Sequence, residues 1–192
     1  MMGGSYFANA TVFLVDTLFG LYIGAVMLRL ILQLVRADFY NPLCQAIVKI
    51  TNPLVRPLRR YIPAVRRIDS ASVLLMMGLQ LLNTILLLLL IGHPIRPAGL
   101  VVLALAELIG KVIYLYTIGI FIGVIASWIA PASYNPVLAV VESVIAPLLR
   151  PVRRLLPALG GLDLSPLVVL LGLQLMLILV VAPLKDLGAA LI

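Results

Sequence analysis

The chain has 192 residues, of which 64% are hydrophobic and only 11% are charged, and its mean hydropathy is +1.22. Soluble domains are about 45–50% apolar and about 25% charged, and so small a globule could not bury such a surplus of apolar surface. The net charge of +7 would suggest nucleic-acid binding in a soluble protein, but here the basic residues occupy short loops between apolar stretches. The composition thus excludes a soluble domain, predicts an all-α integral membrane protein, and gives no reason to expect direct nucleic-acid binding.

Four apolar stretches are long enough to cross the hydrocarbon layer, which takes about 20 helical residues. They predict transmembrane helices over about 10–35, 71–91, 99–130 and 164–183. Residues 1–15 contain no Lys or Arg, so the start lacks the basic region of a signal peptide and is interpreted as a tail leading into the first span.

Positive charge is concentrated in the loops after the first and third spans. The short link at 92–97 carries only Arg96, and the C-terminal segment carries only Lys185. By the positive-inside rule, both basic loops are expected in the cytoplasm and both termini on the outer side.

The chain repeats itself at an offset of 94 residues without a gap. Ten of the 24 positions from Tyr40 to Pro63 are identical to their counterparts. This period divides the chain into units 1–96 and 97–192, each with two spans, which makes them parallel repeats. The shared motif residues include Asn41, Pro42, Pro53 and Pro57 in the first unit and Asn135, Pro136, Pro147 and Pro151 in the second.

The repeated loop predicts a short interfacial helix. Asn41 and Pro42 suit the N-cap and first turn, and an amphipathic helix is expected from Leu43 to Thr51. Pro53 and Pro57 are expected to prevent a longer helix, leaving arginines at headgroup height. These arginines either fix topology and bind anionic lipid, or form a docking site for an acidic partner. They are Arg56, Arg59, Arg60, Arg150, Arg153 and Arg154.

Four ionisable residues lie within the predicted spans, where they are costly. Glu107 and Lys111 are spaced to pair on one helix face, Arg29 is expected to snorkel toward the cytoplasmic interface, and Asp16 to reach water near the outer end. Both a structural role and an ion or proton path remain open for them.

Uncharged polar and small residues in the spans favour helix packing. Gln80, Asn83 and Gln174 are interpreted as hydrogen-bonding across helices, and two GxxxG patterns, at 20–24 and 119–123, as allowing close approach. Asp69 and Asp163 are candidate N-caps of the second span in each unit, with Ser70 and Ser165 as the alternatives.

The remaining residue types suggest no reaction chemistry. Cys44 is interpreted as a packing residue, with palmitoylation as an alternative, and the lone histidine, His93, does not suggest a metal site. No nucleophile–base set, phosphate loop or catalytic carboxylate pair is recognisable. We therefore expect neither an enzyme nor a cofactor.

The doubled Asn-Pro block, followed by Pro-x-x-Arg-Pro-x-Arg-Arg-x-x-Pro and an Asp before an apolar Gly-Leu-Gln-Leu span, resembles the YggT (YlmG) family over nearly the whole chain. The resemblance to two-copy bacterial members implies the bacterial inner membrane, with periplasmic termini. Bacterial relatives are linked to osmotic tolerance, potassium homeostasis and cell division. Single-copy plastid relatives are linked to nucleoid distribution and haem attachment, but His93 alone makes haem ligation here unexpected. The second copy has Gly160-Gly161 where the first has Arg66-Arg67.

Two functions remain open. The first is a scaffold or assembly factor that binds anionic lipid headgroups and partner inner-membrane proteins through its basic loops, in the context of osmotic adaptation. The second is a small ion-handling protein related to potassium uptake, which would need to assemble as a homo-oligomer because four spans make only a narrow bundle.

Overall fold

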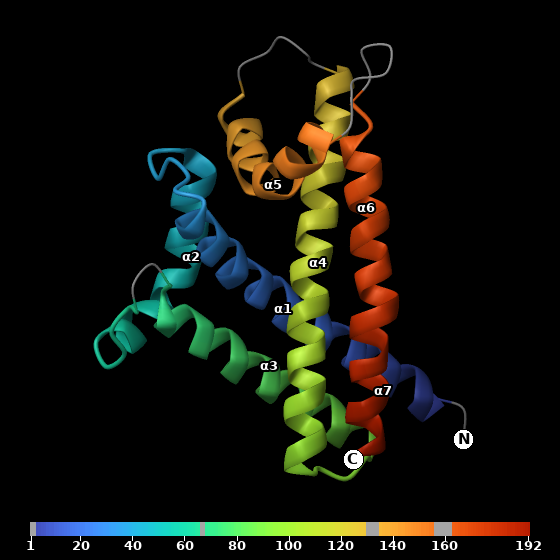
Figure 1. The fold of residues 1–192 in the computed structure, drawn as a ribbon. Helices are drawn as coiled ribbons and strands as arrows, with labels where there is room; N and C mark the ends of the chain where they lie inside the picture. Colours follow the sequence, from blue (N-terminus) through green and yellow to red (C-terminus); the bar gives the residue numbers. More distant parts are fainter. Residues whose placement is uncertain (1–2, 66–67, 130–134, 156–162) are drawn as a thin grey trace.

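The computed structural model describes residues 3–65, 68–129, 135–155 and 163–192. The first repeat contains α1 (Gly3–Leu34), α2 (Pro42–Arg59) and α3 (Ser70–Ile91). The second contains α4 (Pro97–Ile129), α5 (Pro136–Leu155) and α6 (Ser165–Met176), which continues through a π-helical turn, η1 (Leu177–Val181), into α7 (Ala182–Ala190). In each repeat, two long helices form a hairpin and a shorter helix lies at its closed end, away from both termini (Figure 1).

Within the described residues, four helices are long and apolar enough to cross a membrane, which confirms the predicted number of spans. They cover Tyr6–Leu34, Ser70–Ile91, Pro97–Ile129 and Ser165–Ala190. The first therefore starts earlier than expected and the fourth extends further. The chain is a multi-pass membrane protein.

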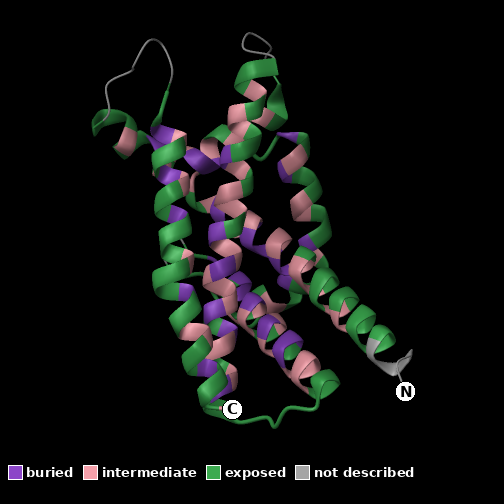
Figure 2. Cartoon of the chain, turned by 90° about the vertical axis from the view of Figure 1, so that its right-hand side faces the viewer, coloured by how far each residue is buried: buried purple, intermediate pink, exposed green. Residues whose placement is uncertain are grey.

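The two hairpins cross at a marked angle, with α1 and α3 running diagonally behind the nearly parallel α4 and α6 (Figure 1). The buried core is small and lies where they meet, with Ile23, Val26 and Leu32 of α1 and Ile120 of α4 almost completely enclosed. Exposed residues dominate the outer sides of the spans (Figure 2). Because so many exposed side chains are large and apolar, lipid must solvate them.

The interfacial helices are longer than the prolines suggested, and the expectation that α2 ends at Thr51 is wrong. Helix α2 continues through Pro53 and Pro57 to Arg59, and α5 likewise contains Pro147 and Pro151. Each proline removes a hydrogen bond to the carbonyl four residues earlier. In both helices the two prolines are four residues apart and exposed, so they lie on the same outer face. The carbonyl groups that lose their hydrogen bonds therefore also lie on this face, where the surroundings of the protein can solvate them.

Glycines set the closest helix contacts in the second repeat. A Cβ atom at Gly119 or Gly123 would lie 3.0 or 2.9 Å from the side chain of Ile145, so this GxxxG pattern packs α4 against α5. A Cβ at Gly20 would be 3.8 Å from Lys111, and one at Gly24 would meet nothing within 4 Å, so the first pattern makes no comparable approach. Sequence reasoning missed Gly99 and Gly188, where a Cβ atom would lie 2.7 Å from the other helix.

We expect Gly99→Val to destabilise the protein by about 1–3 kcal/mol, the usual range for overpacking. A Cβ at Gly99 would lie 2.7 Å from the carbonyl oxygen of Gly188 and 3.0 Å from the backbone nitrogen of Ile192, so helix backbones must shift. Thermal unfolding in detergent, followed by circular dichroism, measures the effect. Gly172→Ala is the control, because its Cβ would meet nothing within 4 Å. An unchanged midpoint for Gly99→Val would contradict the close α4–α7 approach.

Candidate functional site

The two interfacial helices start in the same way, as the Asn-Pro motif predicted. The side chain of Asn41 accepts a hydrogen bond from the Leu43 N–H at 3.0 Å, and that of Asn135 accepts one from the Val137 N–H at 2.9 Å. Asn41 also donates from Nδ2 to the carbonyl oxygen of Pro136 at 2.5 Å. This bond joins the starts of α2 and α5.

The six motif arginines divide into two classes that the sequence did not distinguish. Arg59 forms an ion pair with Asp69 at 2.6 Å, and Arg153 forms the equivalent pair with Asp163 at 2.7 Å. These two arginines connect the last turn of each interfacial helix to the start of the following span. The other four are exposed and form no ion pair within the part of the chain that the structure describes: Arg56, Arg60, Arg150 and Arg154.

The repeated ion pair is better protected in the first repeat. The Asp69 side chain is 2% exposed and also accepts a hydrogen bond from the Ser72 hydroxyl, whereas the Asp163 side chain is 43% exposed. Burial raises the pKa of Asp69, but the hydrogen bonds from Arg59 and Ser72 and the nearby positive charges outweigh it, so its pKa is lowered. The pKa of Asp163 is lowered in the same way, with burial opposed by hydrogen bonds from Ser165 and Arg153.

The two aspartates were expected to be N-caps. Asp69 occupies the N-cap position of α3, whereas the N-cap position of α6 is Leu164, one residue after Asp163. Asp163 accepts a hydrogen bond from the Ser165 N–H at 2.9 Å, whereas Asp69 makes no such cap bond and uses its carboxylate for Arg59 and Ser72. The sequence did contain a signal for the ion pairs, because an arginine precedes an aspartate by ten residues in both copies of the repeat.

Arg29 does not snorkel out of the protein, contrary to expectation. Its side chain is buried, and Nη1 donates to the hydroxyl oxygen of Thr51 at 2.7 Å and to Oδ1 of Asn52 at 2.9 Å. Asn52, which is partly buried, thus faces α1 in part. These two oxygens on α2 accept the hydrogen bonds that water would otherwise accept from the buried guanidinium group. Arg29 therefore holds α2 against α1.

The other intramembrane charges are also held by partners. Glu107 and Lys111 form the predicted pair at 3.6 Å, and Glu107 also pairs with Lys185 of α7 at 2.7 Å, which sequence reasoning missed. Asp16 is exposed, as expected, and accepts a hydrogen bond from Asn83 on α3 at 2.9 Å. These contacts tie α4 to α7 and α1 to α3.

The two equivalent glutamines behave differently, and neither forms the expected cross-helix bond with another residue that the structure describes. Gln80 is buried and donates to Thr84 on its own helix at 3.4 Å, while Gln174 is exposed and lines a cavity between α4, α5 and α6. The carbonyl oxygens of Gln80 and Asn83 are buried without a hydrogen-bond partner within the described ranges.

Cys44 and His93 are the residues that bear on modification and metal binding. Cys44 is completely buried, as a packing residue should be, and burial raises the pKa of its thiol. His93 is exposed in the link after α3, and the residues described contain no group of three or more potential metal ligands. The pairs Arg66-Arg67 and Gly160-Gly161 lie outside the described residues.

Comparison with known proteins agrees with the internal repeat and with the resemblance to the YggT family. The model of the CCB3/YggT family matches residues 8–90 and 102–184, two stretches that are offset by the same 94 residues. An uncharacterized protein of Pseudomonas aeruginosa is 46% identical over 180 residues, covering 90% of this chain and 89% of its own length. An uncharacterized protein of Vibrio alginolyticus is 44% identical over 168 residues, covering 86% and 90%.

The uncharacterized protein YggT of Escherichia coli is 38% identical over 169 residues, covering 85% of both chains. No solved structure matches the chain significantly. The family model matches twice, and the relatives align over most of their length. The chain therefore belongs to the CCB3/YggT family and carries two copies of its domain.

Proposed function

We propose that this protein is a bacterial inner-membrane scaffold or accessory protein whose paired interfacial helices bind anionic lipid headgroups and partner membrane proteins. The basic surface, defined as Arg56, Arg60, Arg150 and Arg154, carries the proposal. These four side chains are exposed at the C-terminal ends of α2 and α5, with no ion-pair partner within the described residues. Osmotic adaptation is the cellular context that the family resemblance suggests.

The ion pairs of the two repeats support this role by positioning the basic surface. Arg59 and Arg153 each bind an aspartate at the start of the next span, which holds the neighbouring arginines at the membrane end of the hairpin. Guanidinium groups bind phosphate oxygens in a bidentate manner. In the proposed topology this end is cytoplasmic and both termini are periplasmic, in agreement with the positive-inside rule.

The alternative, an ion-handling role, would need free ionisable groups in the spans. Glu107 is bound by two lysines and Asp16 by Asn83, so these contacts weigh toward a structural role. We therefore favour the scaffold.

Changing all four arginines of the basic surface to Gln should abolish enrichment of anionic lipid around the protein. Each Lys or Arg near an anionic surface contributes about 1 kcal/mol, or about fivefold in affinity. The measurement is mass spectrometry of lipids and proteins that co-purify in native-lipid particles. Partner proteins that need the basic surface should be lost together with the anionic lipid.

Two matched variants control this experiment. Arg96→Gln removes a positive charge from the link at the opposite end of the spans and should change nothing. Changing the four arginines to Lys keeps the charge and should retain anionic lipid, while partners that need bidentate contacts should dissociate. Unchanged lipid and protein composition in the Gln variant would refute the proposal.

A further inference from the structure

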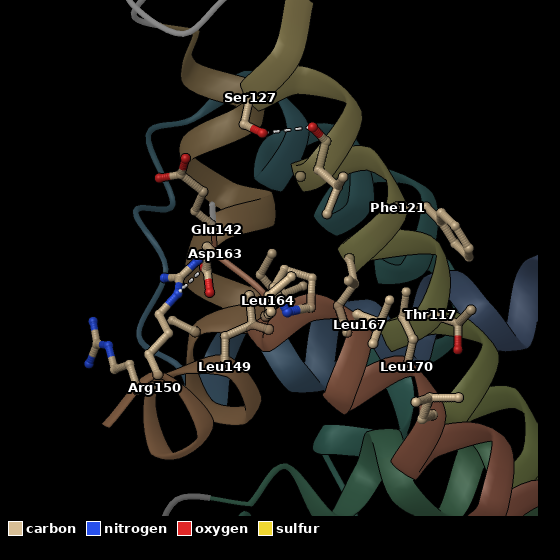
Figure 3. Close-up of a pocket in the computed structure, with 18 of the residues that line it drawn as sticks. Thr117, Phe121, Ser127, Glu142, Leu149, Arg150, Asp163, Leu164, Leu167 and Leu170 are labelled. Atoms are coloured by element: carbon tan, nitrogen blue, oxygen red, sulfur yellow. Dashed lines mark hydrogen bonds and ion pairs between the residues drawn. The ribbon is translucent and has the colours of Figure 1, made fainter. Parts of the chain in front are cut away.

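A cavity of about 1370 Å³ lies between α4, α5 and α6 in the second repeat. This volume exceeds the roughly 300–1,000 Å³ of most small-molecule pockets. Much of its wall is apolar, with Ile120 and Phe121 from α4, Leu149 from α5, and Leu167 and Leu170 from α6. Figure 3 shows Glu142, Asp163 and Arg150 gathered on one side, and Thr117, Phe121, Leu167 and Leu170 on the other. The cavity therefore has an apolar part and a charged rim.

The first repeat has different residues at the positions equivalent to part of this wall. Shifted by 94 residues, Gly123 on the cavity wall corresponds to Arg29, whose buried side chain bonds to Thr51 and Asn52. In the second repeat the counterparts of those two partners are Ile145 and Ala146, which cannot bind a guanidinium side chain. The second repeat thus lacks the arginine anchor of the first, and the side chain of Ile145 packs against Gly119 and Gly123 instead.

A second difference between the repeats adds charge at the rim. Glu142 lines the cavity, whereas its counterpart in the first repeat is the partly buried Val48. Arg150 lines it as well, about 12 Å along α5 from Glu142 at a rise of about 1.5 Å per residue. Neither side chain forms an ion pair or hydrogen bond with any other residue that the structure describes, while Arg153 and Asp163 at the same rim neutralise each other. The free rim charges are one acid and one base.

We propose that this cavity binds one bilayer phospholipid with a primary-amine headgroup, its phosphate on Arg150, its ammonium group on Glu142 and an acyl chain between α4 and α6. An anionic headgroup would pair with Arg150, but its negative charge would repel the carboxylate of Glu142. A quaternary ammonium group has no N–H to donate to the Glu142 carboxylate. The inference rests on the proposed function in one respect, that Arg150 binds a lipid phosphate, and adds a specific cavity and headgroup class.

The single tryptophan provides the measurement, since Trp128 lines the cavity. Phospholipids with brominated acyl chains are titrated into the purified protein in detergent, and Trp128 fluorescence quenching is recorded. Three headgroups are compared on the same acyl chains: phosphatidylethanolamine, phosphatidylcholine and phosphatidylglycerol. We expect saturable quenching by phosphatidylethanolamine at a mole fraction about tenfold lower than for the other two, the difference that a charged hydrogen bond makes.

Two variants locate the binding. Glu142 is exposed, and Glu142→Gln should remove the tenfold preference for phosphatidylethanolamine. Asp186 is an exposed acidic residue on α7, and the control variant Asp186→Asn should preserve the preference. The triple change Gly123→Arg, Ile145→Thr and Ala146→Asn copies the arrangement of the first repeat and should reduce all three lipids to non-saturable background quenching. If the triple variant does not fold, Glu142→Gln decides alone.

The outcomes separate this inference from the proposed function. Arg56→Gln with Arg60→Gln, in the first repeat, should weaken anionic-lipid enrichment and leave Trp128 quenching unchanged. Equal quenching by all three headgroups, or strongest quenching by phosphatidylglycerol, would overturn the cavity assignment even if the basic surface enriches anionic lipid. Retained headgroup preference with no anionic enrichment would refute the scaffold surface and leave the cavity site standing.

Discussion

Replacing Arg29 with Met should destabilise the protein by about 2–4 kcal/mol, which for a chain of this size lowers the unfolding midpoint by about 5–15 °C. The buried guanidinium group donates hydrogen bonds of 2.7 and 2.9 Å to Thr51 and Asn52, and bonds to charged groups contribute about 1.5–3 kcal/mol each. Met fills much of the same volume but leaves the Asn52 oxygen without its donor. The measurement is thermal unfolding in detergent, followed by circular dichroism.

A matched arginine change separates this effect from a general loss of charge. Arg96→Met alters an exposed residue in the link before α4 and should shift the midpoint by no more than an ordinary surface change, about 0.5 kcal/mol. Equal shifts for the two variants would show that Arg29 does not fasten α2 to α1. A destabilised Arg29→Met variant that still inserts into the membrane would support the anchoring role, because insertion depends on the spans.

Removing the repeated aspartates should have unequal effects in the two repeats. Asp69→Ala breaks an ion pair in which the Asp69 side chain is 2% exposed, and we expect it to lower the free energy of unfolding by about 2–3 kcal/mol. This is less than the roughly 3–5 kcal/mol for breaking a fully buried pair, because Arg59 is 43% exposed and can reach solvent. Asp163→Ala breaks a pair exposed on both sides and should cost about 0–1 kcal/mol. Thermal unfolding of the two variants at pH 7 gives the comparison.

The contribution of Asp69 should also depend on pH with a defined sign. Its folded-state pKa is lowered, so the ion pair contributes its full stability above the unfolded-state pKa of about 3.9 and loses it as the pH falls through the folded-state value. The difference in unfolding midpoint between the wild type and Asp69→Ala should therefore be constant near neutral pH and shrink below about pH 4. A difference that persists undiminished at pH 2 would contradict the ion-pair explanation.

The proline-containing helices show where a local rule failed. Pro53 and Pro57 were expected to end α2, because each removes a backbone donor. Their spacing of four residues places both on the exposed face, and the buried residues of α2, among them Thr51 and Val55, continue on the other face. Packing against the hairpin thus maintains a helix that local propensity alone would end.

Features that depend on neighbours along the chain can be predicted from the sequence alone. The number of spans follows from apolar length, the Asn41 and Asn135 caps from a bond two residues ahead, and the Glu107–Lys111 pair from one helical turn. The repeat is a property of the sequence itself, and the family-model matches at 8–90 and 102–184 have the same offset.

The polar contacts between different helices could be identified only in the folded chain. Arg29 bonds to residues 22 and 23 positions away, Asp16 to Asn83 across 67 positions, and Glu107 to Lys185 on the last helix. Which faces meet depends on the helix crossing angles, and apolar spans with little periodic patterning do not encode them locally. For the same reason the difference between Arg29 and Gly123 is visible in the sequence, but its consequence required the packed structure: an arginine bonded to α2 in the first repeat, and Ile145 of α5 packed against α4 in the second.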